Sequence, residues 1–533
     1  MDTKGEMPGN TKFPNRRKIT STFWISLIAV LIVVLAALLF DERFTNITST
    51  IRNAISAGGG WFYLLTVLFL IMVCAVLVVS PIGKIRLGDP DSKPQFSTVA
   101  WFAMLFAAGM GISLVFYGAA EPLAHFAVQA PEAALYSKEA LLDAFKYSFF
   151  HYGIHGWAAY AIVALAIAYF QFRKKENTLL SATLKPLFGK SVNGPFGKIV
   201  DSITIFAMVV GVTTSLGTGA VQINSGINTL FGVPVSFLIQ VLIILIATAL
   251  FITSAVLGLD KGVKRLSNLN MILAAILMII AFIVGPGIKM LNTFTETFGA
   301  YMNDFLRLSV RTGVNNPAQQ EWINQWTVFF WSWWLAWSPF VGVFIARISK
   351  GRTIREFIVF VLLIPSLFSF IWFSIFGVMS TETFAVNPEI AGQPLEQMLF
   401  TTFANYPLAT VMSIIAILLL IIFFVTSADS ATFVLGMQSE GGALHPSNRI
   451  KAIWGILVSA IAIVLLRAGG LSALQNVLII AALPFTMLLI LVTISLIKEL
   501  NYERRQMGLT VLPRRQPEKD APFRSYESDS DKE

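Results

Sequence analysis

Residues 331–342 read WSWWLAWSPFVG, a run of tryptophans that ends in a proline and a glycine. Six of the twelve tryptophans in the chain lie between Trp322 and Trp337. Pro339 lacks a backbone hydrogen-bond donor and Gly342 loosens the backbone. We therefore expect the helix that contains them to unwind near the middle of a membrane.

The aromatic cluster also predicts a ligand. Indole rings are the best partners for a quaternary ammonium group, because its methylated charge forms no strong hydrogen bonds. An interfacial aromatic belt is the alternative interpretation, but a belt places one or two rings at each helix end rather than several along one span. The cluster therefore favours a pocket for a methylated cation at membrane depth.

The composition is that of a membrane protein. Of the 533 residues, 56% are hydrophobic and 13% are charged, and no soluble domain of this size could bury so much apolar surface. Apolar runs of about 20 residues, long enough to cross a hydrocarbon core, recur along the chain. We expect twelve spans, at 21–41, 61–83, 98–119, 143–170, 197–227, 233–257, 269–290, 323–346, 356–379, 407–433, 450–467 and 473–497. The sequence predicts an all-α polytopic membrane protein with an N-terminal tail at 1–20, a transmembrane domain at 21–497 and a C-terminal tail at 498–533.

The formal net charge of +9 comes from lysines and arginines that gather in alternate loops, while the intervening loops are acidic. Cytoplasmic loops carry such an excess of positive residues, so both tails are predicted to be cytoplasmic in a multi-pass protein of the cell membrane. No basic patch lies on a soluble domain, which argues against a nucleic-acid partner.

A second weakened span lies five spans before the first, where residues 107–113 read AAGMGIS. Spans 3–7 and 8–12 would then form two five-helix halves, each beginning with a broken helix. Paired discontinuous helices in corresponding positions are the best sequence indication of a transporter binding site. The alternative is that the glycines only allow close helix packing.

Four motifs resemble those of the betaine/carnitine/choline transporter family. They read AAGMGISLVFYG at 107–118, WSWWLAWSPFVG at 331–342, ARISKGRTIRE at 346–356 and FFVTSADS at 423–430. The resemblance extends from the first span to the twelfth, and the nearest members look like Gram-positive glycine betaine importers used in osmoprotection. It implies a leucine-transporter-like core of two inverted five-helix repeats, preceded by two extra helices, and a homotrimer.

The resemblance also implies where a small zwitterionic or quaternary ammonium substrate binds. An aromatic box would hold the trimethylammonium group, formed by Trp333, Trp334, Trp337 and Phe340 of the eighth span and by Tyr152, Trp157 and Tyr160 of the fourth. The substrate carboxylate would meet backbone amides near Gly111 and Ser113, where the third span unwinds.

Two of these residues differ from the usual pattern of betaine carriers. Tyr152 stands where tryptophan is usual, and Ser113 stands where glycine is usual. An acidic residue at position 113 accompanies choline in the family, so serine argues against choline alone. Ectoine, proline and carnitine remain alternatives to glycine betaine. The alternative for Ser113 is a substitution that leaves the substrate unchanged.

Accumulation against a gradient needs a coupling ion, and the resemblance implies sodium. Its ligands would be the hydroxyls of Thr426 and Ser427 with the carbonyls of Ala107, Met110 and Phe423. Sodium-independent exchange and proton coupling through Asp429 are the alternatives. Without the family, the two hydroxyls would more often simply bond to a helix carbonyl.

No enzyme is expected, because no nucleophile with a base and no cluster of catalytic carboxylates is evident. Cys74 is the single cysteine. His151 and His155 are spaced as a helical pair, but no third metal ligand is obvious. We therefore expect no cofactor besides the coupling ion, with membrane lipid as a further partner of the basic loop at 347–356.

Overall fold

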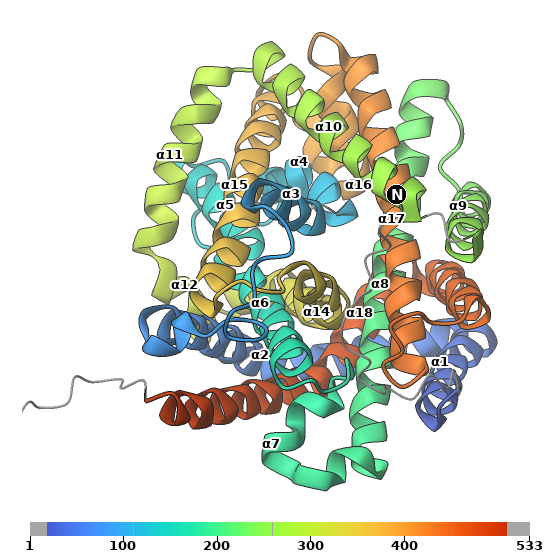
Figure 1. Ribbon diagram of the computed structural model, residues 1–533. Helices are drawn as coiled ribbons and strands as arrows, with labels where there is room; N and C mark the ends of the chain where they lie inside the picture. The colour runs from blue at the N-terminus through green and yellow to red at the C-terminus, as the bar shows by residue number, and fades with distance from the viewer. Residues whose placement is uncertain (1–18, 110, 258–259, 509–533) are drawn as a thin grey trace, which may run out of the picture.

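The computed structural model describes residues 19–109, 111–257 and 260–508, and this part of the chain is helical without a β-strand (Figure 1). Short 3-10 and π segments separate some of the helices. The α-helices are α1 (Ser21–Leu39), α2 (Asp41–Val79), α3 (Thr98–Gly109), α4 (Ile112–Ala127), α5 (Lys138–Tyr152), α6 (Ile154–Ala168), α7 (Lys185–Phe188), α8 (Pro195–Phe231), α9 (Phe237–Leu257), α10 (Asp260–Val284), α11 (Gly287–Asn303), α12 (Phe305–Val310), α13 (Pro317–Gln325), α14 (Thr327–Ile348), α15 (Ile354–Val386), α16 (Leu395–Ala404), α17 (Ala409–Ser439) and α18 (Asn448–Gln506).

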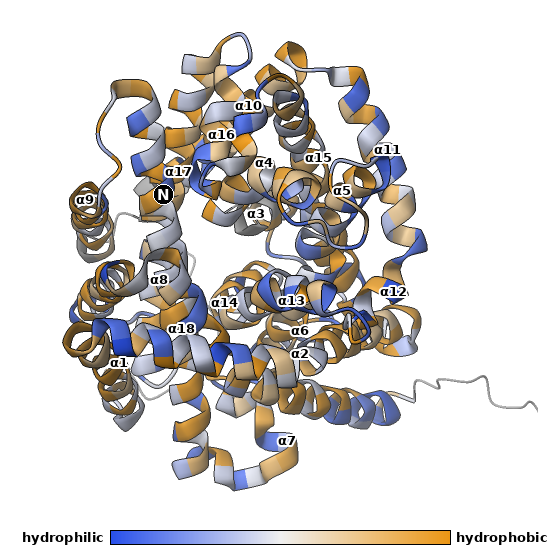
Figure 2. Cartoon of the chain, turned by 180° about the vertical axis from the view of Figure 1, so that it is seen from behind, coloured by the Kyte–Doolittle hydropathy of each residue, from blue (hydrophilic) through white to orange (hydrophobic). Residues whose placement is uncertain are grey.

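Ten helices of the described residues are long and apolar enough to cross a membrane. The difference from twelve has two causes. The predicted third span is divided into α3 and α4, each too short to span alone. The last two predicted spans are both contained in the 59 residues of α18, which bends where Gly469 and Gly470 leave the helical conformation. The polytopic all-helical fold is therefore confirmed, and outward faces such as that of α9 are hydrophobic (Figure 2).

The third span breaks as predicted. α3 ends at Gly109 and α4 begins at Ile112, with Gly111 in an extended conformation between them (φ −152°, ψ 173°). An extended residue cannot continue the ladder of helical hydrogen bonds, so the first amides of α4 lack helical partners.

The eighth span does not break, and here the prediction was wrong. α14 is continuous from Thr327 to Ile348 with Pro339 inside it. The Oγ of buried Ser338 donates a hydrogen bond to the carbonyl of Leu335 at 2.7 Å. That carbonyl lies four residues before Pro339, so the serine hydroxyl replaces the donor that the proline lacks.

Gly342 serves close packing, as the alternative interpretation proposed. A Cβ at this position would lie 2.7 Å from Cγ1 of Val163 and 3.2 Å from the backbone nitrogen of Ala164, both on α6. α14 and α6 therefore pack backbone to backbone in the middle of the bundle, as Figure 1 illustrates.

The replacement of a backbone donor by Ser338 can be tested by stability. Changing Ser338→Ala is expected to lower the free energy of unfolding by about 1–3 kcal/mol, because the Leu335 carbonyl is left buried without a donor. In the double variant Ser338→Ala, Pro339→Ala, the restored backbone amide should recover most of the loss. Thermal unfolding of the detergent-solubilised protein checks both, and equal melting temperatures for the single and double variants would contradict the explanation.

Two groups of ion pairs lie outside the predicted apolar spans. Arg307, on α12, forms ion pairs with Glu132 at 2.8 Å and with Asp304 at 2.6 Å. The hydrogen bond that Arg307 donates to Asp304 lowers the pKa of Asp304 to about 2. At the other end, α18 continues past residue 497, where the tail was predicted to begin. There, buried Glu503 pairs with Arg173 and accepts a hydrogen bond from Tyr169 at 2.5 Å.

Candidate functional site

A pocket lies where the break in the third span faces α14. Its lining combines the extended backbone between α3 and α4 with aromatic side chains from α5, α6 and α14, and its residues are Gly111, Ile112, Ser113, Tyr152, Tyr160, Ser215, Phe330, Trp333, Trp334 and Trp337. Seven of the nine predicted substrate residues are among them. Trp157 and Phe340 are not.

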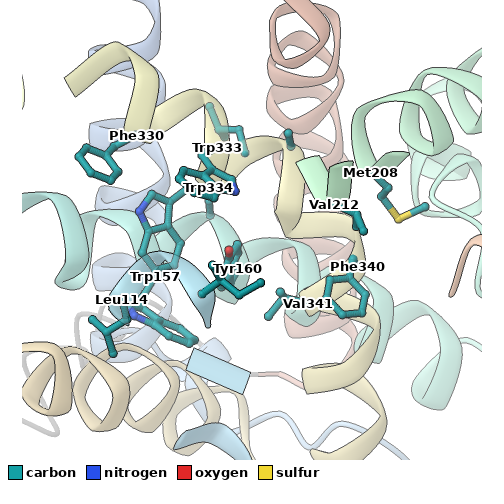
Figure 3. Close-up of a cluster of buried hydrophobic side chains, with 14 of the residues drawn as sticks. Leu114, Trp157, Tyr160, Met208, Val212, Phe330, Trp333, Trp334, Phe340 and Val341 are labelled. Carbon is teal, nitrogen blue, oxygen red and sulfur yellow. The ribbon is translucent and has the colours of Figure 1, made fainter. Parts of the chain in front are cut away.

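The two predicted rings outside the lining have other roles. Trp157 is fully buried behind Tyr160 and Trp334, with ring centroids 5.3 and 5.6 Å away. Phe340 packs against Trp337 at 5.2 Å and lies toward Met208 and Val212 (Figure 3). Both rings support the wall of the pocket rather than its surface.

Trp334 is the most firmly held ring of the wall. Its indole Nε1 donates to the carbonyl of His151 at 2.9 Å, and its ring lies 4.6 Å from that of Tyr160. The ring rests on Gly156, where an added Cβ would lie only 2.3 Å from Cε2 of Trp334. The indole is therefore fixed by one hydrogen bond and by the absence of a side chain at Gly156.

A second helix break, not predicted from the sequence, lies next to the pocket residue Tyr152. The predicted fourth span is divided at Gly153 (φ −95°, ψ −148°), so α5 ends at Tyr152 and α6 begins at Ile154. A Cβ at Gly153 would lie 2.7 Å from the ring of Phe370. The only signal in the sequence was the glycine after Tyr152, which by itself does not distinguish a break from close packing.

The polar end of the pocket is the start of α4. The N-terminus of a helix presents free amides and a partial positive charge, so this end of the pocket suits a carboxylate. The hydroxyl of Tyr152 donates to the carbonyl of Ser113 at 3.3 Å and joins the end of α5 to the start of α4. Aromatic faces and backbone amides thus meet in one cavity.

The predicted sodium ligands are placed in part. Phe423, Thr426 and Ser427 lie on α17, and the Thr426 hydroxyl donates to the Ile422 carbonyl at 2.8 Å. Ala107 lies in the last turn of α3, and Met110 lies outside the described residues. α17 does approach the break, because a Cβ on Gly219 of α8 would touch Ile112 at 2.8 Å and Phe424 at 3.3 Å.

Broken membrane helices around an aromatic pocket are typical of one class of protein, the multi-pass membrane transporters for small solutes. A family model described as betaine/carnitine/choline family transporter matches residues 21–505. The chain therefore belongs to the betaine/carnitine/choline transporter family, as its motifs predicted, and is a multi-pass protein of the cell membrane.

Individual relatives cover nearly the whole chain. The chain is 51% identical over 492 residues to the glycine betaine transporter OpuD of Bacillus subtilis, covering 92% of this chain and 96% of that protein. It is 40% identical to an ectoine/hydroxyectoine transporter of Virgibacillus pantothenticus, covering 90% and 96%. It is 38% identical to a glycine betaine/proline/choline transporter of Vibrio parahaemolyticus, covering 91% and 90%.

Proposed function

We propose that the protein is a sodium-coupled symporter that imports glycine betaine or a related compatible solute by alternating access, in the plasma membrane of a Gram-positive bacterium. The observation that carries this proposal is the pocket itself, which is lined by three tryptophans and by the first residues of α4. A zwitterion with a methylated cation at one end and a carboxylate at the other matches this arrangement.

The substrate class follows from the two ends of the pocket. Four rings that line it, Trp333, Trp334, Trp337 and Phe330, provide no charged group, so the cation is held by aromatic faces and desolvation. Glycine betaine is favoured by the 51% identity with a glycine betaine transporter. Ectoine is the second candidate, because Tyr152 and Ser113 add hydroxyl groups at the polar end, and a relative at 40% identity is named for ectoine and hydroxyectoine.

Sodium coupling is supported by the chemistry of α17. The Thr426 hydroxyl donates its hydrogen to the Ile422 carbonyl, so the lone pairs of the hydroxyl oxygen remain available to a hard cation. The Phe423 carbonyl lies 3.5 Å from the same oxygen, so a carbonyl and a hydroxyl are already adjacent. Ala107, in the last turn of α3, would add its carbonyl, and the carbonyl of Met110 stays a predicted ligand outside the described residues.

Assembly and lipid contact follow the family resemblance. We propose a homotrimer, with Arg347 and Lys350 of the basic loop at the lipid head groups because both side chains are exposed. Arg352 of the same loop is instead buried, with its guanidinium 4.6 Å from the Trp101 ring, and takes no part.

Uptake of radiolabelled solute into proteoliposomes tests the function. We expect glycine betaine to accumulate with an inward sodium gradient and to be competed by ectoine, proline, carnitine and choline in an order that defines specificity. Equal uptake in potassium-only buffer would refute sodium coupling. Stronger competition by ectoine than by betaine would replace the proposed substrate.

The sodium site has its own prediction. Changing Thr426→Ala is expected to raise the sodium concentration for half-maximal uptake at least several-fold, because one oxygen ligand is lost. Thr432→Ala is the matched control, since Thr432 is a buried threonine of α17 whose hydroxyl also donates to a helix carbonyl, that of Asp429, at 2.9 Å. An unchanged sodium dependence in Thr426→Ala would remove this residue from the site.

A further inference from the structure

A buried polar cluster adjoins the aromatic pocket and has no part in the proposed transport site. It consists of Glu121 and His125 on α4 and His151 on α5, all with 0% exposure. Within the described residues, one ligand atom from each of the three side chains lies within 4.8 Å of the others. The cluster touches the pocket wall, because the His151 ring stacks on Phe330 with centroids 4.7 Å apart.

The cluster does not contain the pair of histidines, His151 and His155, that are spaced four residues apart in the sequence. His155 turns away and bonds to the hydroxyls of Tyr301 and Ser309 at 2.9 and 2.8 Å. His151 instead lies beside Glu121 and His125, which are 30 and 26 positions earlier in the chain. The sequence did not predict that these three residues meet, because only the packing of α4 against α5 brings Glu121 and His125 beside His151.

The distances within the cluster fit metal ligands. The Oε1 atom of Glu121 lies 2.6 Å from Nδ1 of His151 and 3.3 Å from Nε2 of His125. Two atoms of the cluster, Oε2 of Glu121 and Nδ1 of His125, are buried and have no hydrogen-bond partner in the part of the chain that the structure describes. A buried carboxylate and an unpaired imidazole nitrogen are costly unless something compensates them, and a cation would compensate the carboxylate.

We propose that Glu121, His125 and His151 bind a divalent transition-metal ion, of the borderline class represented by Zn²⁺ and Co²⁺. Two imidazole nitrogens and one carboxylate oxygen are the ligands that such ions prefer, with one position left open. Ligand bonds of about 2.0–2.1 Å place the atoms of a tetrahedral site roughly 3.3 Å apart. The distance between Nε2 of His125 and Oε1 of Glu121 already has this value. A small rotation of the Glu121 carboxylate would lengthen its 2.6 Å distance to Nδ1 of His151.

An outer contact orients the site. Nε2 of His151 lies 3.0 Å from Oγ1 of Thr327, at the start of α14. A metal-binding histidine bonded through its second nitrogen keeps the first one directed at the ion. Because a hydroxyl can accept as well as donate, the Thr327 contact is compatible with the tautomer of His151 in which Nε2 carries the hydrogen and Nδ1 carries the lone pair.

The site lies where an ion would affect motion. Its ligands join α4, the second half of the third span, to α5, the first half of the fourth. The breaks at Gly111 and Gly153 begin and end these two segments beside the pocket. A bound ion clamps them together and slows the transport cycle, whichever solute is carried and whichever ion couples it.

Cobalt absorption tests the binding without transport. The full-length protein, purified in detergent with any polyhistidine tag removed, is titrated with Co²⁺ and then with Zn²⁺. We expect the visible absorption of tetrahedral Co²⁺ to saturate near one ion per chain and to be abolished by Zn²⁺. No such absorption from the unaltered protein overturns the proposal.

Variants locate the site. His125→Gln and Glu121→Gln should weaken Co²⁺ binding at least tenfold, whereas His445→Gln, at an exposed histidine outside the cluster, should bind as the wild type does. His125→Cys should keep the ion and add a sulfur-to-cobalt charge-transfer band, a signature that a merely structural role of His125 does not produce. Loss of binding in His445→Gln with retention in both cluster variants overturns the assignment.

Solute uptake tests whether an ion that holds α4 and α5 together slows the transport cycle. Zn²⁺ should slow solute uptake into proteoliposomes by the wild-type protein at least severalfold, and should slow His125→Gln far less, each relative to its own rate without metal. Equal rates with and without saturating Zn²⁺ overturn the clamp. A failure of the proposed substrate or of sodium coupling would appear in the metal-free uptake instead, so the two outcomes are distinguishable.

Discussion

Replacing Trp337 with leucine is expected to raise the half-saturation constant for a quaternary ammonium solute about tenfold. Trp337 lines the pocket, and cation–π attraction to a desolvated cation contributes roughly 1–2 kcal/mol per ring, where 1.4 kcal/mol is a factor of ten. The Nε1 atom of Trp337 has no hydrogen-bond partner among the described residues, so the substitution removes ring attraction without breaking a bond. Initial uptake rates over a range of solute concentrations give the constant.

Two controls separate ring attraction from damage to the fold. Trp337→Phe keeps an aromatic face and should recover part of the affinity. Trp24→Leu removes an indole from the outer surface, where Trp24 is 54% exposed, and should change nothing. An unaltered half-saturation constant in Trp337→Leu, with Trp24→Leu also normal, would exclude Trp337 from the cation site.

Gly156→Ala is expected to reduce solute uptake by at least tenfold at substrate concentrations below saturation. A Cβ at this position would lie 2.3, 2.6 and 2.7 Å from three atoms of the Trp334 indole. The ring has to shift, and its hydrogen bond to the His151 carbonyl is then lost or strained. Since Trp334 lines the pocket, one methyl group on α6 should disturb substrate binding without touching the substrate.

The matched control uses a glycine with free space around it. Gly299 lies on α11, and no atom of the described residues lies within 4 Å of a Cβ placed there. Gly299→Ala should therefore transport as the wild type does, because an alanine in a helix is at least as stable as a glycine. Expression and melting temperature of both variants are measured beside uptake. Normal uptake by Gly156→Ala would show that the position of Trp334 does not control binding.

Much of the fold could be predicted from composition and local sequence pattern. Membrane-spanning helices were predictable because lipid imposes one requirement on every span, about twenty apolar residues with internal hydrogen bonds. The break at 109–112 was predictable for a similar reason, since two glycines in a short stretch lower helix stability locally. The run of rings along one span predicted an aromatic pocket, and the family resemblance selected Trp333, Trp334 and Trp337 from it, all of which line the pocket.

Other outcomes depended on neighbours that no local pattern reveals. Pro339 should have broken α14, but the hydroxyl of Ser338 supplies the missing hydrogen bond. Trp157 matched the aromatic motif yet lies behind the pocket, because the depth of a ring depends on which helices pack over it. The lack of room for a side chain at Gly153 comes in part from the ring of Phe370, which is more than two hundred residues away in the chain.

Length, hydrophobicity and the tryptophan run were therefore sufficient to predict a polytopic membrane protein with an aromatic pocket, because these properties are local and repeated along the chain. The packing of α4 and α5 alone decided that Glu121, His125 and His151 share one buried cluster. Side chains from separate helices converge through the sum of many weak contacts, and no short segment of sequence contains that sum.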